Sequence, residues 1–364
     1  MLAMAVFPFS RGVRNAAGGA AWPAVLLLAA LLLPSACHRA SETPVLGEFE
    51  KGVAYTGYGA AAYEGDGPLL ALDRLAATNA SWTSVLVTGY QDTIHTTAID
   101  FTGPGTPTDA SVERIIGHAH DLGLKVMLKP HVDLANDSSH YRGEIGPNFT
   151  AADWAAWFAS YRPFILRYAA MAERTACELF CVGCELGTTA VHAAEWREIV
   201  AAVRGVYRGP LIYADNQVEY NPDGVTWWDA VDLIGQDAYP TLTPIVAPTV
   251  DDLLAGWVPF RAKLQALSEK WDKPLVLTEI GCRSIGGGAQ NPWDWQRQGP
   301  VDLAVQANFY EAACRAVEGR SWLRGMYWWQ WSPDPDDGGP DDTGYTPHGK
   351  PAEQILSSWY ARLR

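Results

Sequence analysis

Two glutamates follow short apolar segments in a pattern that suits acid–base chemistry. Glu185 closes the run that begins at Leu179, and Glu279 lies near the end of the run that begins at Leu275. Each run is short and apolar, and a glycine follows within two residues, which is typical of a β-strand and the turn after it. An ionisable side chain in this position would lie at the carboxyl end of its strand.

Two carboxyl groups over one cleft are the minimum requirement for cleaving a glycosidic bond. One carboxylic acid protonates the leaving oxygen, and a second carboxylate acts on the other side of the anomeric carbon. Glutamate suits this work because its longer side chain reaches into a cleft from a rigid strand. Either residue alone could instead be a strand-end partner in a salt bridge, so the prediction depends on both sharing one pattern.

The remaining chain alternates strand-like and helical segments in an order that would position both glutamates. Strands are predicted at Gly52–Tyr58, Trp82–Thr88, Lys125–Pro130, Leu179–Glu185, Leu211–Ala214, Leu233–Gln236, Leu275–Glu279 and Gly325–Trp331. Eight β–α pairs in this order predict an α/β fold, a single closed (β/α)₈ TIM barrel over residues 51–364. The main alternative is an open doubly wound sheet, but no glycine-rich phosphate-binding turn follows the first strand.

Functional side chains in such barrels lie at the carboxyl ends of the strands and in the loops that follow. Besides the two glutamates, polar or aromatic candidates at these positions are His131, Asp133, Asp215, Asn216, Asp237, Tyr239 and the segment Trp328–Trp331. His131 and Asn216 could each contact a substrate hydroxyl or bond to a neighbouring strand end. The acidic loop from Asp334 to Asp342 lacks the spacing and closing glutamate of an EF-hand, so we expect a solvated loop and no metal site.

Composition narrows the class of partner. The net charge is −14 and no basic cluster occurs, which argues against a nucleic acid or an anionic membrane surface as partner. The 16 Trp and 15 Tyr residues provide flat aromatic faces that suit sugar rings, although a large core also contains such residues. No cofactor is expected, and the sequence does not determine the oligomeric state.

The amino-terminal sequence has the pattern of an export signal. Arg11 and Arg14 precede the apolar stretch Ala20–Leu33, and small residues follow it. This pattern predicts a signal peptide over residues 1–36 and a short tether over residues 37–50. Cys37 either carries the lipid of a bacterial lipoprotein, tethering the protein to a membrane, or follows an ordinary cleavage after Ala36. The mature protein would then be periplasmic, a cell-surface lipoprotein or secreted.

The cysteines do not point to a redox or zinc site. Six occur in the sequence, and five remain beyond Cys37, an odd number that leaves at least one thiol unpaired within the chain. Cys181 and Cys184 have the spacing of a redox pair, but they lie within a predicted strand rather than at a helix N-terminus, where thiol pKa values fall.

Several motifs together resemble a known family. They are Lys129–Asp133, Gly183–Leu186, Leu277–Ser284, Trp328–Pro333, Gly344–Pro347 and Gly349–Ala352. In these segments the chain resembles glycoside hydrolase family 113, a family of (β/α)₈ enzymes whose described members are endo-β-1,4-mannanases. The resemblance implies that Glu185 is the general acid/base and Glu279 the nucleophile. The chain departs from many members of the wider clan at Cys184, where an asparagine commonly contacts the 2-hydroxyl of the sugar.

Physical reasoning leads to the same two roles. The nucleophile must stay ionised, and Arg283 and the Tyr239 hydroxyl are candidate donors to Glu279. The acid must be protonated, so a drier pocket or the neighbouring charge should raise the pKa of Glu185. We expect retention of anomeric configuration, with the carboxyl groups about 5–5.5 Å apart. Strand alternation places Trp329 and Trp331 on the inner face as sugar platforms and Trp328 beneath the helices, with burial of all three in the core as the alternative.

The sequence therefore predicts a retaining endo-acting glycoside hydrolase that cleaves β-1,4-linked mannan. The same machinery acting on another β-glycan, by hydrolysis or transglycosylation, is a neighbouring alternative. A non-catalytic glycan-binding protein of the cell surface is an alternative from a different class. The presence of both glutamates disfavours it, because binding alone does not need them.

Overall fold

The computed structural model describes residues 48–363. The predicted signal peptide, Cys37 and nearly all of the predicted tether lie outside the described residues. The first strand, β1, begins at Glu50, so the barrel starts within the last residues of that tether.

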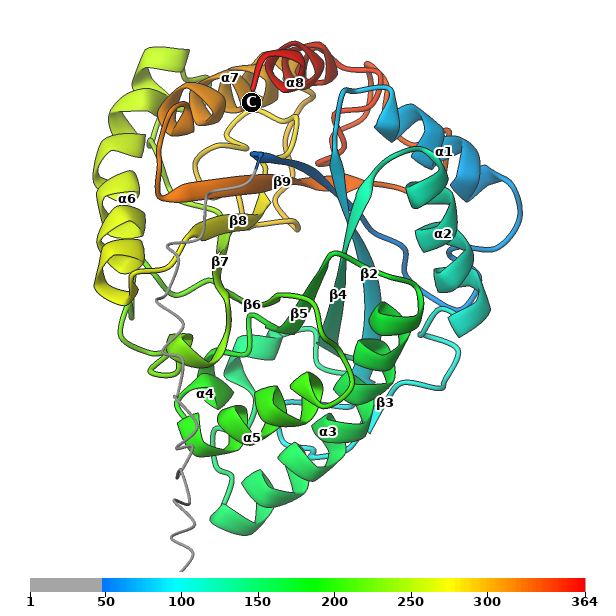
Figure 1. The fold of residues 1–364 in the computed structure, drawn as a ribbon. Coiled ribbons are helices and arrows are strands. Elements are labelled where there is room, and N and C mark those ends of the chain that lie inside the picture. Colours follow the sequence, from blue (N-terminus) through cyan, green and yellow to red (C-terminus); the bar gives the residue numbers. More distant parts are fainter. Residues whose placement is uncertain (1–47, 364) are drawn as a thin grey trace, which may run out of the picture. The chain divides into compact units, whose positions relative to one another are not determined.

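Parallel strands close into a barrel, which confirms the predicted (β/α)₈ fold. Within the described residues the strands are β1 (Glu50–Tyr55), β2 (Trp82–Gln91), β3 (Ile99–Asp100), β4 (Lys125–Leu134), β5 (Leu179–Cys184), β6 (Leu211–Asp215), β7 (Leu233–Ala238), β8 (Leu275–Ile280) and β9 (Leu323–Trp331). Strand β1 pairs in parallel with both β2 and β9, and this double pairing closes the ring (Figure 1).

The helices lie around the outside of the strands (Figure 1). They are α1 (Gly67–Ala76), α2 (Asp109–Asp121), α3 (Ala151–Arg174), α4 (Gly187–Ala190), α5 (Ala193–Arg204), α6 (Val250–Trp271), α7 (Leu303–Val317) and α8 (Pro351–Arg362), with 3₁₀ turns η1 (Arg142–Glu144) and η2 (Trp228–Ala230). None of the helices in the described part of the chain combines the length and apolar character needed to cross a bilayer.

Two elements differ from a strict alternation. The short strand β3 pairs antiparallel with β2 and stands outside the ring, so β5 and β8 are the fourth and seventh strands of the barrel. Between β6 and β7 the chain forms only the turn η2 instead of a full helix. The predicted order of the eight barrel strands is otherwise the observed one.

Local sequence explains where the long helices start. Thr150 and Thr249 each cap a helix by accepting a hydrogen bond from the backbone three residues on. Asp153 and Asp252 return the bond to the cap residue, which completes a capping box at both sites. These reciprocal bonds satisfy amide groups that would otherwise lack partners at a helix start.

Packing occurs on both sides of the strands. A small cluster that includes Met127, Cys184 and Tyr327 fills the barrel interior. A larger cluster, which includes Trp328 and Tyr310, lies between the strands and the surrounding helices. Alternate residues of one strand therefore contribute to two different cores.

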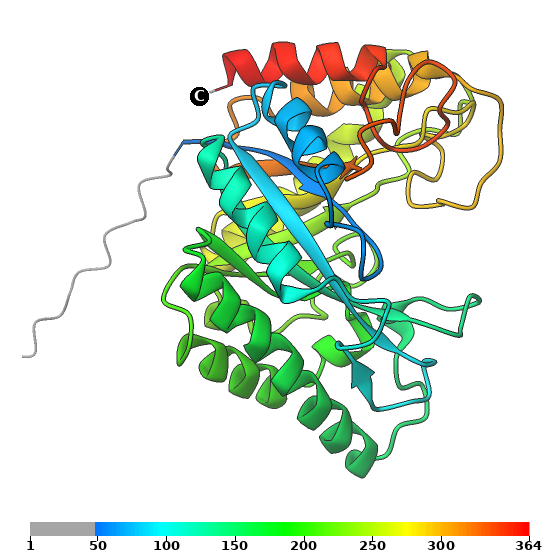
Figure 2. The ribbon, with the colours of Figure 1, turned by 90° about the vertical axis from the view of Figure 1, so that its right-hand side faces the viewer.

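The carboxyl ends of the barrel strands open at one end of the ring. Figure 2 shows the long loops after β4 and β8 standing out from this same end. The side chains that close β4, β5, β7 and β8 therefore meet there, and we call this end the mouth of the barrel.

Candidate active site

Glu279 lies on β8 with a hydrogen-bond donor at each carboxylate oxygen. The Lys129 ammonium of β4 lies 2.5 Å from Oε1, and the Tyr239 hydroxyl donates to Oε2 over 2.7 Å. The Glu279 side chain is almost fully buried. Lys129 is equally buried and also bonds to both oxygens of Asp237, at 3.0 and 3.2 Å. One ammonium therefore joins two carboxylates from neighbouring strands.

Glu185 directly follows β5 in an unusual backbone conformation. Its φ angle is 54°, in the left-handed region that non-glycine residues seldom adopt. Its amide donates to the Ala214 carbonyl over 2.8 Å, which ties the turn to β6. The chain leaves the strand here and enters α4 at Gly187, so the backbone turns at the very residue whose carboxyl reaches the mouth. Strained backbone of this kind is commonly found at functional sites.

Arg142 supplies the cation for Glu185. This residue belongs to η1, in the loop between β4 and α3, and its Nη1 lies 2.8 Å from Oε2 of Glu185. Its Nη2 donates to Asp133 over 3.2 Å. A bond from Thr188 of α4 to the Ile145 carbonyl, at 2.5 Å, joins this short helix to the residue that follows η1. Each glutamate is thus paired with a different cation.

The two glutamates converge around Cys184. Its thiol donates to Asp237 over 3.2 Å, and its sulfur lies within 4.8 Å of a carboxylate oxygen of both Glu185 and Glu279. One carboxylate oxygen of Glu185 and one of Glu279 therefore lie less than twice that distance apart. His131, Cys184 and Glu279 come close enough together to be considered as metal ligands, but a cation there would have to compete with the Lys129 ammonium. The arrangement favours proton chemistry over metal binding.

Burial determines how this pair holds a proton. It raises the pKa of Glu279, where the charge of Asp237 adds to the effect and Lys129 opposes it. Burial also raises the pKa of Glu185 against the opposing charge of Arg142. A close pair of carboxyls with raised pKa values retains one proton between them near neutral pH.

Hydrogen bonding decides which carboxyl carries that proton. Both oxygens of Glu279 accept bonds, and the Lys129 ammonium cannot accept one in return. Glu185 accepts from Arg142 through Oε2 and keeps Oε1 available for a proton. The geometry therefore favours an ionised Glu279 and a protonated Glu185.

His131 lies beside Glu279 with a free ring nitrogen. Its Nε2 is 3.7 Å from Oε1 of Glu279, and this buried atom has no hydrogen-bond partner among the described residues. Burial, together with the charges of Arg142 and Lys129, lowers the pKa of His131 well below its ordinary value, so the ring is neutral at neutral pH. The ring lies parallel to the Trp329 indole, with 6.3 Å between centroids.

The aromatic residues of β9 separate into two groups. Trp329 is partly exposed at the mouth, whereas Trp328 is buried and stacks on Tyr310 at 3.6 Å, as predicted for the helix side. The prediction that Trp331 offers a sugar platform is wrong, because this residue is 2% exposed and packs with the outer core. Val53 of β1 pairs with Trp328 and Tyr55 with Trp331, so one extra residue interrupts β9. That irregularity turns Trp331 to the outer face.

Arg283 does not contact Glu279, which corrects the predicted donor. Its Nε donates to the Thr343 carbonyl over 3.1 Å, and its Nη1 donates to the Trp295 carbonyl over 3.0 Å. No hydrogen bond joins it to Glu279 within residues 48–363. The residue lies beyond the end of β8, where its side chain holds loops together, and Lys129 occupies the place beside the carboxylate.

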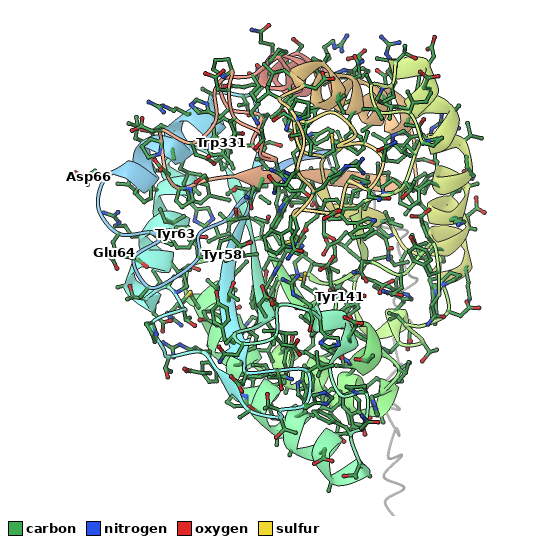
Figure 3. The ribbon with its side chains drawn as sticks, turned by 180° about the vertical axis from the view of Figure 1, so that it is seen from behind. Tyr58, Tyr63, Glu64, Asp66, Tyr141 and Trp331 are labelled. Carbon is green, nitrogen blue, oxygen red and sulfur yellow. The ribbon has the colours of Figure 1, made fainter. Side chains whose placement is uncertain are left out.

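Asn216 follows β6 and faces Glu185. Its amide is one of the groups that favour the charged form of Glu185 and so limit the rise of its pKa. Its side-chain oxygen accepts a bond from Gln217 over 2.8 Å. Two tyrosines, Tyr58 and Tyr141, complete this part of the mouth (Figure 3), and the Tyr141 hydroxyl accepts a hydrogen bond from Gln217 over 3.3 Å.

The sequence analysis did not identify Lys129 and Arg142 as the cations that pair with the two glutamates. Lys129 carried a signal, because a lysine inside an otherwise apolar strand must find a partner when it is buried. Arg142 carried none, because it lies in a loop with no periodic pattern and its role depends on how that loop folds back. Asp133 and Asp237 were identified at strand ends, but their pairing with Arg142 and Lys129 was not predicted.

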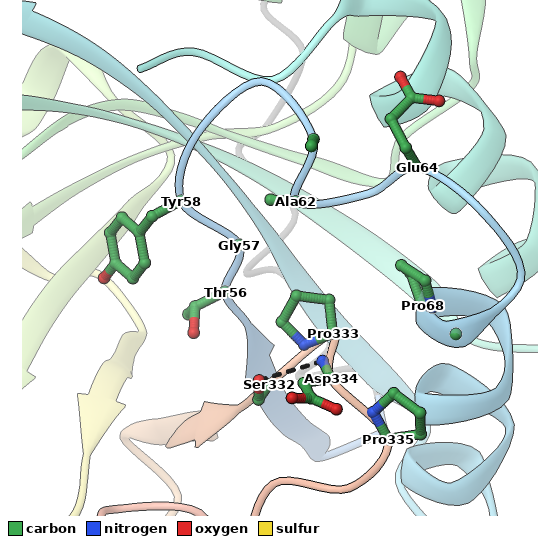
Figure 4. A pocket seen from close by; sticks show the side chains of 12 residues that line it. Thr56, Gly57, Tyr58, Ala62, Glu64, Pro68, Ser332, Pro333, Asp334 and Pro335 are labelled. Carbon is green, nitrogen blue, oxygen red and sulfur yellow. Dashed lines mark hydrogen bonds between the residues drawn. The ribbon is translucent and has the colours of Figure 1, made fainter. Parts of the chain in front are cut away.

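A cavity of about 490 Å³ lies beside the site, between the loops that follow β1 and β9 (Figure 4). Tyr58 and Glu64 line one side, and Ser332 and Asp334 line the other. The Asp334 amide donates to the Ser332 hydroxyl over 3.1 Å, which fixes the start of the β9 loop. Tyr58, which follows β1, also lines this cavity.

Comparison with known proteins agrees with this geometry. The sequence matches the family model of Glycoside Hydrolase Family 113 over residues 57–350. A solved complex of a GH113 β-1,4-mannanase is 31% identical with a TM-score of 0.78, covering 86% of this chain and 99% of that one. The GH113 β-mannanase AaManA from Alicyclobacillus acidocaldarius, in complex with ManMIm, is 34% identical with a TM-score of 0.77, covering 87% of this chain and 98% of that one.

More distant structures show the fold alone. A β-glucuronidase from Ruminococcus gnavus is 13% identical with a TM-score of 0.57, covering 86% of this chain and 50% of that one. No curated protein matches the sequence. The family model nevertheless spans most of the chain, and two solved structures above 30% identity align over nearly their whole length. The chain therefore belongs to glycoside hydrolase family 113.

Proposed function

We propose that this glycoside hydrolase is a retaining endo-β-1,4-mannanase with Glu279 as nucleophile and Glu185 as acid/base. The convergence of the two glutamates on one mouth, each beside its own cation, carries the proposal. The substrate class is supported by the two GH113 structures described as β-1,4-mannanases. Double displacement requires an ionised carboxylate and a protonated one, and the hydrogen bonds around the pair favour that distribution.

In the first step, an oxygen of Glu279 attacks the anomeric carbon of the sugar. The bond from that carbon to the leaving oxygen breaks, and Glu185 gives its proton to the departing chain. Lys129 and Tyr239 hold the attacking carboxylate in place through their bonds to its two oxygens. As Glu279 becomes an ester its negative charge disappears, which removes the repulsion between the two carboxyl groups and so favours the ionised form of Glu185.

In the second step, Glu185 acts as a base. It takes a proton from water, the hydroxide oxygen bonds to the anomeric carbon, and the ester bond to Glu279 breaks. Arg142 favours the ionised Glu185 in this step. Two inversions at one carbon give a product with the configuration of the substrate. The predicted separation of about 5–5.5 Å between the carboxyl groups belongs to this mechanism.

Substrate hydroxyls would meet neutral groups around the pair. His131 offers an unpaired ring nitrogen, and Trp329 presents a partly exposed indole beside it. Asn216 approaches from the side of Glu185. The Cys184 thiol donates its hydrogen bond to Asp237. We therefore assign the contact with the 2-hydroxyl of the sugar to the other polar groups of the mouth rather than to Cys184.

Proton NMR of the first product tests the mechanism. Hydrolysis of β-1,4-linked mannopentaose should release the β-anomer first, with the α-anomer appearing only by mutarotation. Early release of the α-anomer would refute retention. Glu279→Ala and Glu185→Ala should both lose turnover of this substrate, whereas wild-type turnover in both variants would exclude the assignment.

A substrate panel separates the competing functions. Mannan, glucomannan, cellulose and galactan are incubated with equal enzyme, and both reducing ends and viscosity are followed. Cleavage of mannan with an early fall in viscosity supports endo action on β-1,4-mannan. Cleavage confined to another glycan, or transfer to an added oligosaccharide in place of hydrolysis, favours the neighbouring alternatives. Binding without cleavage of any polymer favours a glycan-binding protein.

We further propose that the protein is exported. This rests on the charged segment, apolar stretch and small residues at the amino terminus. Mass spectrometry of the protein from its native cells should show a mature chain beginning at Cys37 with a lipid, or at Cys37 without one. A full-length chain that retains Met1 would contradict the proposal.

A further inference from the structure

Two tryptophans in the loop between β8 and α7 are unusually exposed. The side chains of Trp293 and Trp295 are 56% and 69% exposed, whereas many other tryptophans of the described chain are buried in the core. Ile245 and Val246, in the loop after β7, are also exposed, and Val246 accepts a backbone bond from Gly287 over 2.7 Å. Exposed apolar residues on two loops that are bonded to each other mark an interaction surface.

The loop that carries these tryptophans is held firmly. Arg283 donates to the Trp295 carbonyl over 3.0 Å and to the Thr343 carbonyl over 3.1 Å, so it joins this loop to the loop after β9. The buried Tyr345 hydroxyl donates to the Pro292 carbonyl over 2.7 Å. Both bonds fix backbone next to an exposed indole. The indoles are therefore displayed on a pre-organised support, which lowers the entropy cost of binding.

The same loop borders the catalytic pair. Asn291 lies 3.5 Å from the Thr241 hydroxyl, two residues after the tyrosine that bonds to Glu279. Figure 2 shows the loop between β8 and α7 at the end of the barrel where the strands open. The loop that carries the exposed indoles therefore lies at the same end of the barrel as Glu279.

We propose that Trp293 and Trp295 form a platform that binds hexose units of a β-linked polysaccharide beyond the bond being cleaved. The proposal rests on the proposed function and extends it from the cleavage site to the polymer. An indole face is flat, apolar and large, and it can cover the C–H face of a hexose without competing for its hydroxyls. Arg283 is a positioning residue in this account, because it acts through the loop backbone.

The test compares long and short substrates. The kcat/KM of Trp293→Ala/Trp295→Ala is measured on soluble β-1,4-mannan and on β-1,4-mannotriose. We expect the ratio of the two values to fall about tenfold, the change that 1.4 kcal/mol produces. The double Phe variant should retain the ratio within about threefold because it keeps flat faces, whereas the double Leu variant should behave like Ala.

The outcomes distinguish this inference from the proposed function. If the wild-type enzyme cleaves mannan and the Ala variant keeps the wild-type ratio, the platform is refuted and the proposed function stands. If the wild-type enzyme cleaves neither substrate, the proposed function itself fails. A lowered sedimentation coefficient in the Ala variant would identify the patch as a contact between copies of this chain and would overturn the platform.

Discussion

Replacing Lys129 with methionine should displace the pH profile of this enzyme. The ammonium lies within 3.2 Å of three oxygens from Asp237 and Glu279, and its burial keeps water from replacing it. Burial disfavours its charge, but the adjacent carboxylates raise the pKa of Lys129 well above its ordinary value, so it is a permanent cation. Methionine fills similar space without charge and leaves two carboxylates facing each other.

The size of the effect follows from the distance. An opposite charge within about 4–6 Å lowers a carboxyl pKa by about 1–3 units. Removing Lys129 should therefore raise the first pKa of the glutamate pair by about that amount. Because Glu279 must be ionised to attack, the acidic limb of kcat/KM should move about 1–3 units towards higher pH. Loss of one partner from a buried ion pair should also cost about 3–5 kcal/mol of stability.

The assay is kcat/KM between about pH 4 and pH 9 on a soluble mannan, with thermal unfolding of each variant measured alongside. Lys350→Met is the matched control, because Lys350 is equally buried and lies 2.5 Å from Asp342, away from the glutamates. It should lose stability while its acidic limb stays in place. A folded Lys129→Met enzyme with the wild-type acidic limb would refute this view of how Glu279 is kept ionised.

Three further predictions concern the same cluster. Arg142→Met removes the cation beside Glu185, so the basic limb of kcat/KM should move towards higher pH, and an unmoved limb would count against Glu185 as the acid. Tyr239→Phe removes a bond to a charged oxygen, worth about 1.5–3 kcal/mol, so kcat should fall about 10- to 150-fold while the fold seen by circular dichroism is kept. Burial raises the pKa of Glu185, which holds the proton of the pair, so its contribution to stability is present at low pH and is lost as pH rises through the raised pKa. Thermal unfolding should accordingly show Glu185→Gln gaining stability relative to wild type as pH rises from about 5 to about 9, and a constant difference would contradict the raised pKa.

The fold could be predicted from the sequence because each strand of the barrel is a short apolar run with a clear boundary. The start of α3 can be read from the sequence, because Thr150 and Asp153 form a capping box there. Strand β3 was not, because two residues carry no periodic signal. The strict alternation of strand and helix fails between β6 and β7, where the chain forms only the turn η2.

The site could be predicted from the sequence only in part. The glutamates lie at strand ends, and parallel strands bring such ends together, so their convergence follows from topology. The cations that hold them come from a strand interior and from a loop, and pairing of that kind depends on three-dimensional folding. The prediction for Trp331 assumed that alternate residues of an uninterrupted strand face the same side. Strand β9 contains one extra residue before Trp331, and no local sequence feature indicates it.

The anomeric configuration of the glycosyl azide that forms when azide rescues Glu279→Ala on an aryl β-mannobioside shows directly whether Glu279 is the nucleophile. Without its own carboxylate, the enzyme would let azide attack from the face that Glu279 occupies, and the product should be the α-mannobiosyl azide. The β-azide, or no rescue by any anion in a folded variant, would mean that Glu279 does not lie opposite the leaving group and is not the nucleophile.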